Sequence, residues 1–330
     1  MIAERGEDCM KPSLSIKLPE RDTLKRKLPL FLWSVFRLIL LIGISYVILY
    51  PVIAKLALAF MDRADLNDVT VKWLPRHFTL DNIKTVSKIV DYIPALFRTV
   101  GVCLVISLIE VFVCALSAYG FARFRFKGRG LLFALVIGTL VVPPQTYIVQ
   151  LYSRLQSFDI FGIIGLFNGG EGINLLGGVV PFIVLGVTGM GIRCGLYIFI
   201  MRQTFRALPK EIEEAAKVDG ARTWRTFWQI MLPNAVPTIV VCFVLAFVWQ
   251  WNDTFYTGLF SPSLNTLAQI FSRLNVLITN YLGSWSYVSD SYTRLLCSVG
   301  SLLAIAPIMV FYAFCQKAFV QGTERSGLVG

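Results

Sequence analysis

Two ionisable residues in the middle of apolar segments are the first side chains whose type and place could do chemistry. Glu110 lies about 13 residues into one apolar run and Arg193 about 15 into another, so each would lie roughly 20 Å along a helix. Because a lipid-facing charge is costly, such residues usually pair or line a transport path. We expect Glu110 and Arg193 to form an ion pair inside a helical bundle, with contact to a transported solute as the alternative. Arg37 and Lys55 lie near the ends of their run, can reach the interface and are assigned no site.

The segment VWQWNDTFYTG, residues 248–258, combines aromatic rings with amide and carboxylate groups. Aromatic rings suit the apolar face of a sugar, and amide and carboxylate groups suit its hydroxyls. Trp251, Asn252 and Asp253 are therefore candidate solute-path residues. The alternative is an aromatic belt at the membrane interface, followed by a carboxylate at a helix end.

The charged stretch RALPKEIEEAAKVDGARTWRTFWQIMLP, residues 206–233, interrupts two apolar runs. Pro209 suits the first position of a helix, and acidic residues in its first turns favour the positive end of the helix dipole. Gly220 stands where a left-handed residue would end that helix. The aromatic and apolar residues of 222–233 suit a second helix at the membrane surface. The stretch predicts a docking element held outside the lipid.

The sequence lacks the residues that several kinds of chemistry require. The chain has one histidine, His77, and its seven cysteines show no CxxC spacing, so we expect no metal site. A phosphate-binding GxxxxGK[ST] loop and a nucleophile elbow are both missing from the sequence. The net charge of +11 accompanies no motif for reading nucleic acid. We expect no catalytic residue, no cofactor and no nucleic-acid partner, and therefore no enzyme.

The elements that must position these residues are membrane helices. The 330 residues are 56% hydrophobic and 15% charged, with a mean hydropathy of +0.67, whereas a soluble domain is about 25% charged. A membrane-spanning helix needs about 20 apolar residues. We predict an all-α membrane protein with six transmembrane helices near residues 31–60, 97–121, 131–153, 178–201, 235–259 and 295–316. Pro143 and Pro144 interrupt the third segment.

The distribution of basic residues gives the orientation. With both termini in the cytoplasm, the inner segments hold 19 Lys and Arg residues and the outer loops eight, as the positive-inside rule requires. We expect cytoplasmic tails at 1–30 and 317–330 around a transmembrane domain at 31–316, with a cytoplasmic loop at 202–234. No signal-peptide cleavage pattern is expected at the N-terminus. The outer loops 61–94 and 260–294 should each contain short helical stretches.

The loop 202–234 resembles the EAA signature of permease subunits of binding-protein-dependent ABC importers. Glu214-Ala215-Ala216, Gly220 and the Ile230 to Pro233 ending match the fixed positions, and Asp219 fits the common form. Further stretches are similar to the carbohydrate-uptake branch, of which the maltose-type permease is the familiar example: SAYGFARFRFKGRG, VVPPQ, WND and QKAFVQGTERSGLVG. The resemblance covers roughly residues 30–330.

The resemblance implies a type I ABC importer permease fold in a bacterial-type plasma membrane. It implies half of a translocation pore, with a second permease subunit, usually a distinct chain, as the other half. Two separate ATPase subunits and an extracytoplasmic solute-binding protein would complete the importer of a sugar or oligosaccharide. The EAA loop would couple to the ATPase through the following residues: Glu214, Ala215, Ala216, Asp219 and Gly220.

Two other functions stay open. The same kind of permease could carry a polyol or a glycerophospho-compound. A stand-alone secondary transporter should show internal repeats and broken helices around a midplane ion site, and it would leave the EAA loop unexplained.

Overall fold

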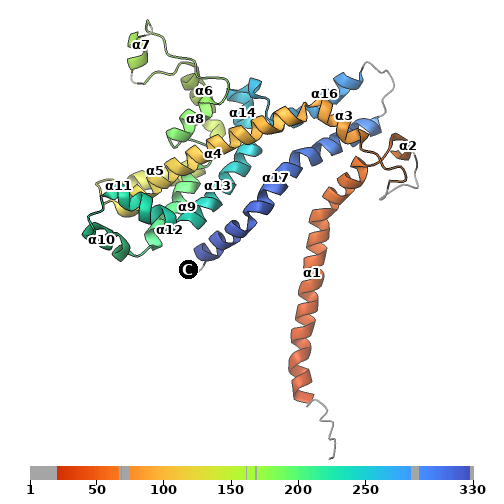
Figure 1. The fold of residues 1–330 in the computed structure, drawn as a ribbon, viewed down its shortest axis with the longest axis horizontal. Helices are drawn as coiled ribbons and strands as arrows, with labels where there is room; N and C mark the ends of the chain where they lie inside the picture. Colours follow the sequence, from red (N-terminus) through yellow and green to blue (C-terminus); the bar gives the residue numbers. More distant parts are fainter. Residues whose placement is uncertain are drawn as a thin grey trace, which may run out of the picture. The chain divides into compact units, whose positions relative to one another are not determined.

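The computed structural model describes residues 21–66, 68, 75–160, 162–167, 169–283 and 290–327 (Figure 1). Within these ranges the chain is helical, with two isolated β-bridges, Met61 to Phe78 and Phe158 to Ile173. The predicted all-α fold is therefore confirmed. In chain order the elements are α1 (Arg21–Ala59), α2 (Arg63–Leu66), α3 (Asp81–Ile89), α4 (Tyr92–Arg123), α5 (Arg129–Val141), η1 (Pro144–Thr146), α6 (Ile148–Gln156), α7 (Ile163–Phe167), α8 (Val180–Val187), α9 (Cys194–Ala207), α10 (Lys210–Val218), α11 (Thr223–Thr226), η2 (Phe227–Met231), α12 (Leu232–Asn234), α13 (Val236–Trp251), α14 (Phe255–Phe260), η3 (Pro262–Leu264), α15 (Leu267–Ser272), α16 (Leu274–Leu282) and α17 (Asp290–Gly327).

The six predicted apolar segments are all helical, but only three form continuous spans. By length and composition, Phe31–Ala59, Tyr92–Arg123 and Ser291–Lys317 could each cross a membrane. The third segment breaks at Pro143 into α5, η1 and α6, since proline lacks a backbone N–H. The fourth breaks between α8 and α9 at Gly189 and its neighbours, a break that was not predicted.

The loop 202–234 joins the fifth segment at a sharp bend. The helical stretch Thr223–Asn234 meets Val236–Asn252 at 78°, and the two together could form a fourth span. The helices predicted in the loops 61–94 and 260–294 are present as α3 and as α15 with α16. Helix α1 begins at Arg21, inside the expected tail, while residues 1–20 and 328–330 lie outside the described residues.

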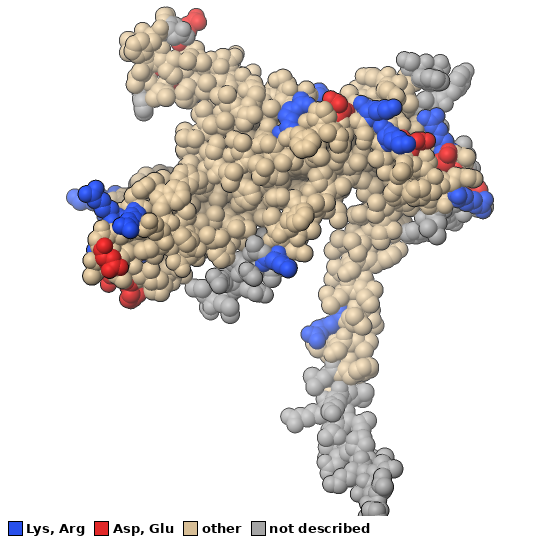
Figure 2. All heavy atoms as spheres, viewed as in Figure 1, with Lys and Arg blue, Asp and Glu red and all other residues tan. Residues whose placement is uncertain are grey.

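The chain divides into two compact units, Met1–Ala54 and Lys55–Gly330. In the first unit α1 exposes nearly all of its large apolar side chains between Phe31 and Leu49. Such a surface suits lipid. In the second unit, the visible charges gather around α10 and α11 and again near α2 and α3, with a largely uncharged band between them (Figure 2). This arrangement fits a membrane domain whose two ends face water.

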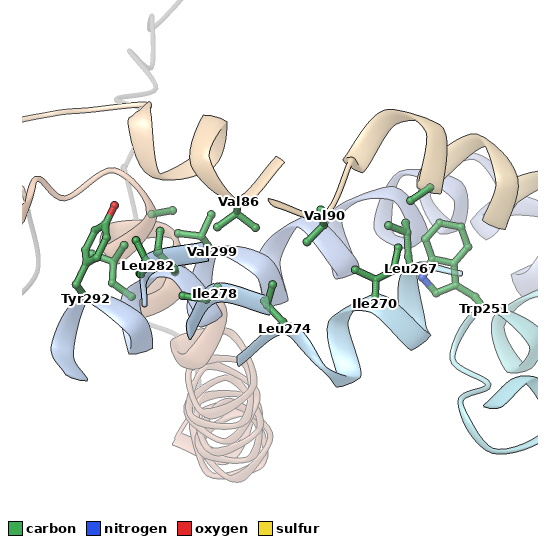
Figure 3. Packing of buried hydrophobic residues seen from close by; sticks show 14 of the residues in the cluster. Val86, Val90, Trp251, Leu267, Ile270, Leu274, Ile278, Leu282, Tyr292 and Val299 are labelled. Atoms are coloured by element: carbon green, nitrogen blue, oxygen red, sulfur yellow. The ribbon is translucent and has the colours of Figure 1, made fainter. Parts of the chain in front are cut away.

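The second unit is built around α4, which packs along α8, α9 and α13. Its 32 residues make a helix about 48 Å long, longer than the roughly 30 Å hydrocarbon core. One apolar cluster joins α4, α9, η2 and α13. A second cluster joins the end of α13 to α3, α15, α16 and α17, where Leu267, Ile278 and Val299 are fully buried (Figure 3).

Gly195 allows α9 to lie close to α5. A Cβ at Gly195 would stand 2.6 Å from Thr139 Oγ1 and 2.9 Å from the Val136 carbonyl oxygen. Small residues serve this purpose in membrane helix pairs because the hydrophobic effect does not drive association there.

We expect Gly195→Ala to destabilise the protein, because the Val136 backbone cannot move aside without shifting α5. Overpacking of this kind costs about 1–3 kcal/mol, and thermal unfolding in detergent should show a lower Tm. The control is Gly101→Ala on α4, where a Cβ meets nothing within 4 Å. An equal Tm for both variants would contradict the close contact.

The loop before α3 is held by one carboxylate. Asp65, which is 3% exposed, accepts hydrogen bonds from the backbone N–H groups of Arg76 and His77, each at 2.9 Å, and lies 2.8 Å from His77 Nδ1. The hydrogen bonds from His77 lower the pKa of Asp65 below its ordinary value.

A carboxyl whose pKa is lowered on folding stabilises the folded loop above its unfolded pKa of about 3.9. That stabilisation is lost as the pH falls through the lower, folded pKa. We expect hydrogen exchange of residues 75–80 to be slow at neutral pH and to lose protection in acid. Asp65→Asn should exchange faster at neutral pH and lose little more on acidification. Identical pH profiles would contradict this role.

Candidate functional site

The helix α10 ends in the predicted left-handed glycine. Gly220 has φ +75°, its N–H bonds to the Lys217 carbonyl at 3.0 Å, and the Ala221 N–H bonds to the Ala216 carbonyl at 2.9 Å. These two bonds form a Schellman motif, which satisfies carbonyls that a helix end leaves open. The predicted break is confirmed, while α10 begins at Lys210 with Pro209 just before it.

One face of α10 is open to solvent. Glu214, Ala215 and Asp219 are exposed, and Val218 is 88% exposed. Ala216 is instead 4% exposed, so this alanine lets α10 lie close to its own chain. Of the five predicted docking residues, four including Gly220 are on the open side and one is turned inward.

The segment after α10 is anchored in the core. Residues Phe227–Met231 form a π-helix, η2, a form frequent at functional sites and not predicted here. Phe227 and Met231 are at most 1% exposed, and the Phe227 ring centroid lies 5.1 Å from that of Tyr119 on α4. The expected membrane-surface helix is therefore only half correct: Trp224 and Trp228 are exposed, but the other face is buried.

A cavity of about 950 Å³ opens where the broken helices meet. It is lined by three stretches: the end of α5 with Val142 to Gln145, the α8–α9 break from Gly189 to Gly195, and Trp249 of α13 with the segment Asn252 to Tyr256 that leads into α14. Non-helical backbone is tolerated at membrane depth where it lines such a cavity. Of the predicted solute-path residues, Arg193, Asn252 and Asp253 line it.

Arg193 and Glu110 are neighbours in space without forming the expected ion pair. The described residues show no ion pair between them within 4.0 Å. The Glu110 carboxylate, 3% exposed, accepts the Ile192 N–H at 3.1 Å. Arg193 has φ +64°, and its guanidinium lies 4.6 Å from the Trp249 ring centroid, a cation–π contact. The prediction failed because the helix break turns Arg193 away from α4 and toward the cavity.

The Gly191 backbone fits against Glu110. A Cβ at Gly191 would stand 2.7 Å from the Glu110 carboxyl carbon. Glu110 therefore supports the break between α8 and α9 from α4, and it is not part of the cavity lining.

The carboxylate of Asp253 is bound within its own chain. It accepts the Tyr256 N–H at 3.1 Å and the Thr257 N–H and hydroxyl, in the first turns of α14. Asn252 is exposed and donates to the Val248 carbonyl at 2.8 Å. Trp251 is 4% exposed in the apolar cluster, so it lies outside the cavity and Trp249 takes its place. Trp249 and Trp251 are two positions apart on α13 and therefore lie on opposite sides of the helix.

Among the described residues, no group of three or more His, Cys, Asp or Glu side chains could hold a metal ion. The six described cysteines are free thiols. The site therefore offers an exposed, capped helix, α10, and a cavity with hydrogen-bonding and aromatic groups.

Comparisons with known proteins give one family. The model of the family described as "Binding-protein-dependent transport system inner membrane component" matches residues 111–325. The alpha-glucoside transport system permease protein AglG of Rhizobium meliloti (strain 1021) is 29% identical over 256 residues, covering 78% of this chain and 62% of that relative. The trehalose transport system permease protein SugB of Mycobacterium tuberculosis (strain CDC 1551 / Oshkosh) is 27% identical, covering 86% and 93%.

A solved structure shares the fold. A chain from a bacterial ABC transporter involved in import of the acidic polysaccharide alginate matches with a TM-score of 0.63 at 20% identity, covering 87% of this chain and 96% of that one.

We expect Gly220→Ala to loosen the end of α10, because a left-handed conformation costs an ordinary residue about 1–2 kcal/mol. Limited trypsin digestion should cut faster after Lys217 and Arg222. Gly220→Asn is the matched control, since asparagine tolerates this conformation. Equal cleavage of the alanine and asparagine variants would show that the Schellman motif does not hold the loop.

Proposed function

The chain belongs to the family of inner-membrane components of binding-protein-dependent transport systems, and from this premise we propose that it is the permease subunit of an ATP-driven importer of a sugar or oligosaccharide. The observation that carries the proposal is the capped, solvent-exposed helix α10, inside the matched region, joined through η2 to the helices that line the cavity. A membrane permease is a multi-pass protein whose own residues hydrolyse no ATP.

The exposed face of α10 is the proposed contact with a separate ATPase subunit. Glu214 would provide a polar contact, Ala215 would allow close seating, and Asp219 would lie at the edge. Gly220 would set the angle at which α10 leaves the loop. Ala216 would serve from the inner side, where it lets α10 pack against its own chain.

The cavity is the proposed solute path. Asn252 and the Arg193 guanidinium offer hydrogen bonds for hydroxyl groups, and Trp249 offers an aromatic surface. Asp253 shapes this wall by holding the start of α14. The relatives named for alpha-glucosides and trehalose, and the alginate transporter, support a carbohydrate as solute.

The proposed assembly contains three kinds of partner. A second permease subunit would supply the other half of the pore, two ATPase subunits would bind from the cytoplasm, and a solute-binding protein would deliver substrate outside. Both termini would lie in the cytoplasm, in keeping with the distribution of basic residues. The family description supports the binding protein directly.

Uptake into proteoliposomes tests this function. The chain reconstituted with its partner subunits should take up one of trehalose, maltose or lactose only when ATP and the binding protein are both present. Uptake by the chain alone would favour a stand-alone transporter. Uptake restricted to mannitol or glycerol 3-phosphate would support the permease function and contradict the proposal that the solute is a sugar.

We expect Glu214→Arg to reduce ATP-dependent uptake about tenfold or more, the scale on which losing one buried interfacial charge contact acts. Asp81→Arg on α3 is the control, because it reverses another exposed acidic residue far from α10 in the sequence. Unchanged uptake with Glu214→Arg would remove α10 from the proposed interface.

A further inference from the structure

Arg123 connects α4 to the end of α9 and to α10. Arg123 is the last residue of α4. Its Nη2 donates to the Leu208 carbonyl, just beyond the end of α9, at 2.6 Å. Its Nε lies 3.1 Å from Glu213 Oε1 on α10. The two charged side chains are 7% and 13% exposed, so solvent screens them little.

Glu213 is the acidic residue of α10 that faces its own chain. Glu211, Glu214 and Asp219 are exposed, which leaves them open to another protein. Glu213 therefore ties α10 to the transmembrane helices, while its neighbours point away.

The contact is ionic in character. Arg123 Nε and Glu213 Oε1 lack a hydrogen-bond partner of good geometry, although they lie 3.1 Å apart. Attraction between charges falls slowly with distance, whereas a hydrogen bond weakens steeply with angle. Such a contact keeps α10 attached while α10 changes its tilt.

Helix α4 also supports the wall of the cavity. Glu110 lies 13 positions before Arg123 on α4, about 20 Å along the helix axis, and supports the break that carries Arg193. A displacement of α10 thus has a direct route along one rigid helix to the cavity wall.

We propose that Arg123, paired with Glu213, is a positioning residue that passes the movement of α10 to α4 and the end of α9. This inference rests on the proposed function. It predicts that the pair matters for the response of the cavity to nucleotide and not for the binding of the ATPase, which uses the outer face of α10.

Thiol labelling in the assembled complex tests the proposal without knowledge of the solute. Val142, which lines the cavity, is replaced by cysteine, and a methanethiosulfonate reagent is added with and without ATP and vanadate. Peptide mass spectrometry reads labelling at residue 142 alone. Co-purification of the ATPase subunit is measured in parallel.

We expect Arg123→Gln and Glu213→Gln each to reduce the nucleotide-dependent change in labelling about threefold or more, with the ATPase still bound. The charge exchange Arg123→Glu with Glu213→Arg should recover part of the response, because it restores the ion pair but not the hydrogen bond to the Leu208 carbonyl. Arg125→Gln, which removes an exposed charge from the loop that follows α4, should leave the response unchanged.

The outcomes separate the two proposals. If the parent Val142→Cys complex binds no ATPase or shows no nucleotide response, the proposed function fails. If it responds and the Arg123 and Glu213 variants respond equally, only the positioning role fails. Loss of ATPase binding in these variants, or a charge exchange that recovers nothing, would also overturn that role.

Discussion

The packing of α4 against α9 and α13 is the contact on which the other features depend. Within it, the rings of Tyr119 and Phe227 join the long central helix to the π-helix that follows α10. Because both rings are almost fully buried, the loop 202–234 cannot shift without disturbing the core. Packed cores change between discrete arrangements and do not deform continuously. The core therefore suits the transfer of a movement between the two ends of the molecule.

Breaks in the helices create the cavity at the other end of this core. Pro143 and the glycine-rich turn before α9 interrupt two spans, which frees backbone groups that lipid would leave unsatisfied. Glu110 satisfies one of them, the Ile192 N–H, from within the 32-residue helix α4. A carboxylate that would be costly in lipid is in this way used to hold a turn. The break between α8 and α9 and the buried carboxylate of Glu110 therefore depend on each other.

The sequence predicted the helical class, the glycine that ends α10 and three polar residues of the cavity, Arg193, Asn252 and Asp253. Each of these follows from local rules of composition or capping. It did not predict the π-helix, since that depends on how Phe227 and Met231 fit between α4 and α9. The prediction of a Glu110–Arg193 pair was wrong for a related reason: a continuous helix was assumed where Gly189 and Arg193, both with positive φ, form a turn. Trp251 and Trp249 lie on different sides of α13, and residue type alone cannot choose between them. Arg123 was part of a familiar motif, but its contact with Glu213 exists only in three dimensions.

The central claim is that α10 carries force between a separate ATPase and the transmembrane core. A structure of the complete importer in lipid nanodiscs, with nucleotide trapped, tests it most directly. The account predicts an ATPase groove enclosing Glu214, Ala215 and Val218, with Glu213 still against Arg123. An ATPase bound elsewhere, with the outer face of α10 left open to solvent, would contradict it.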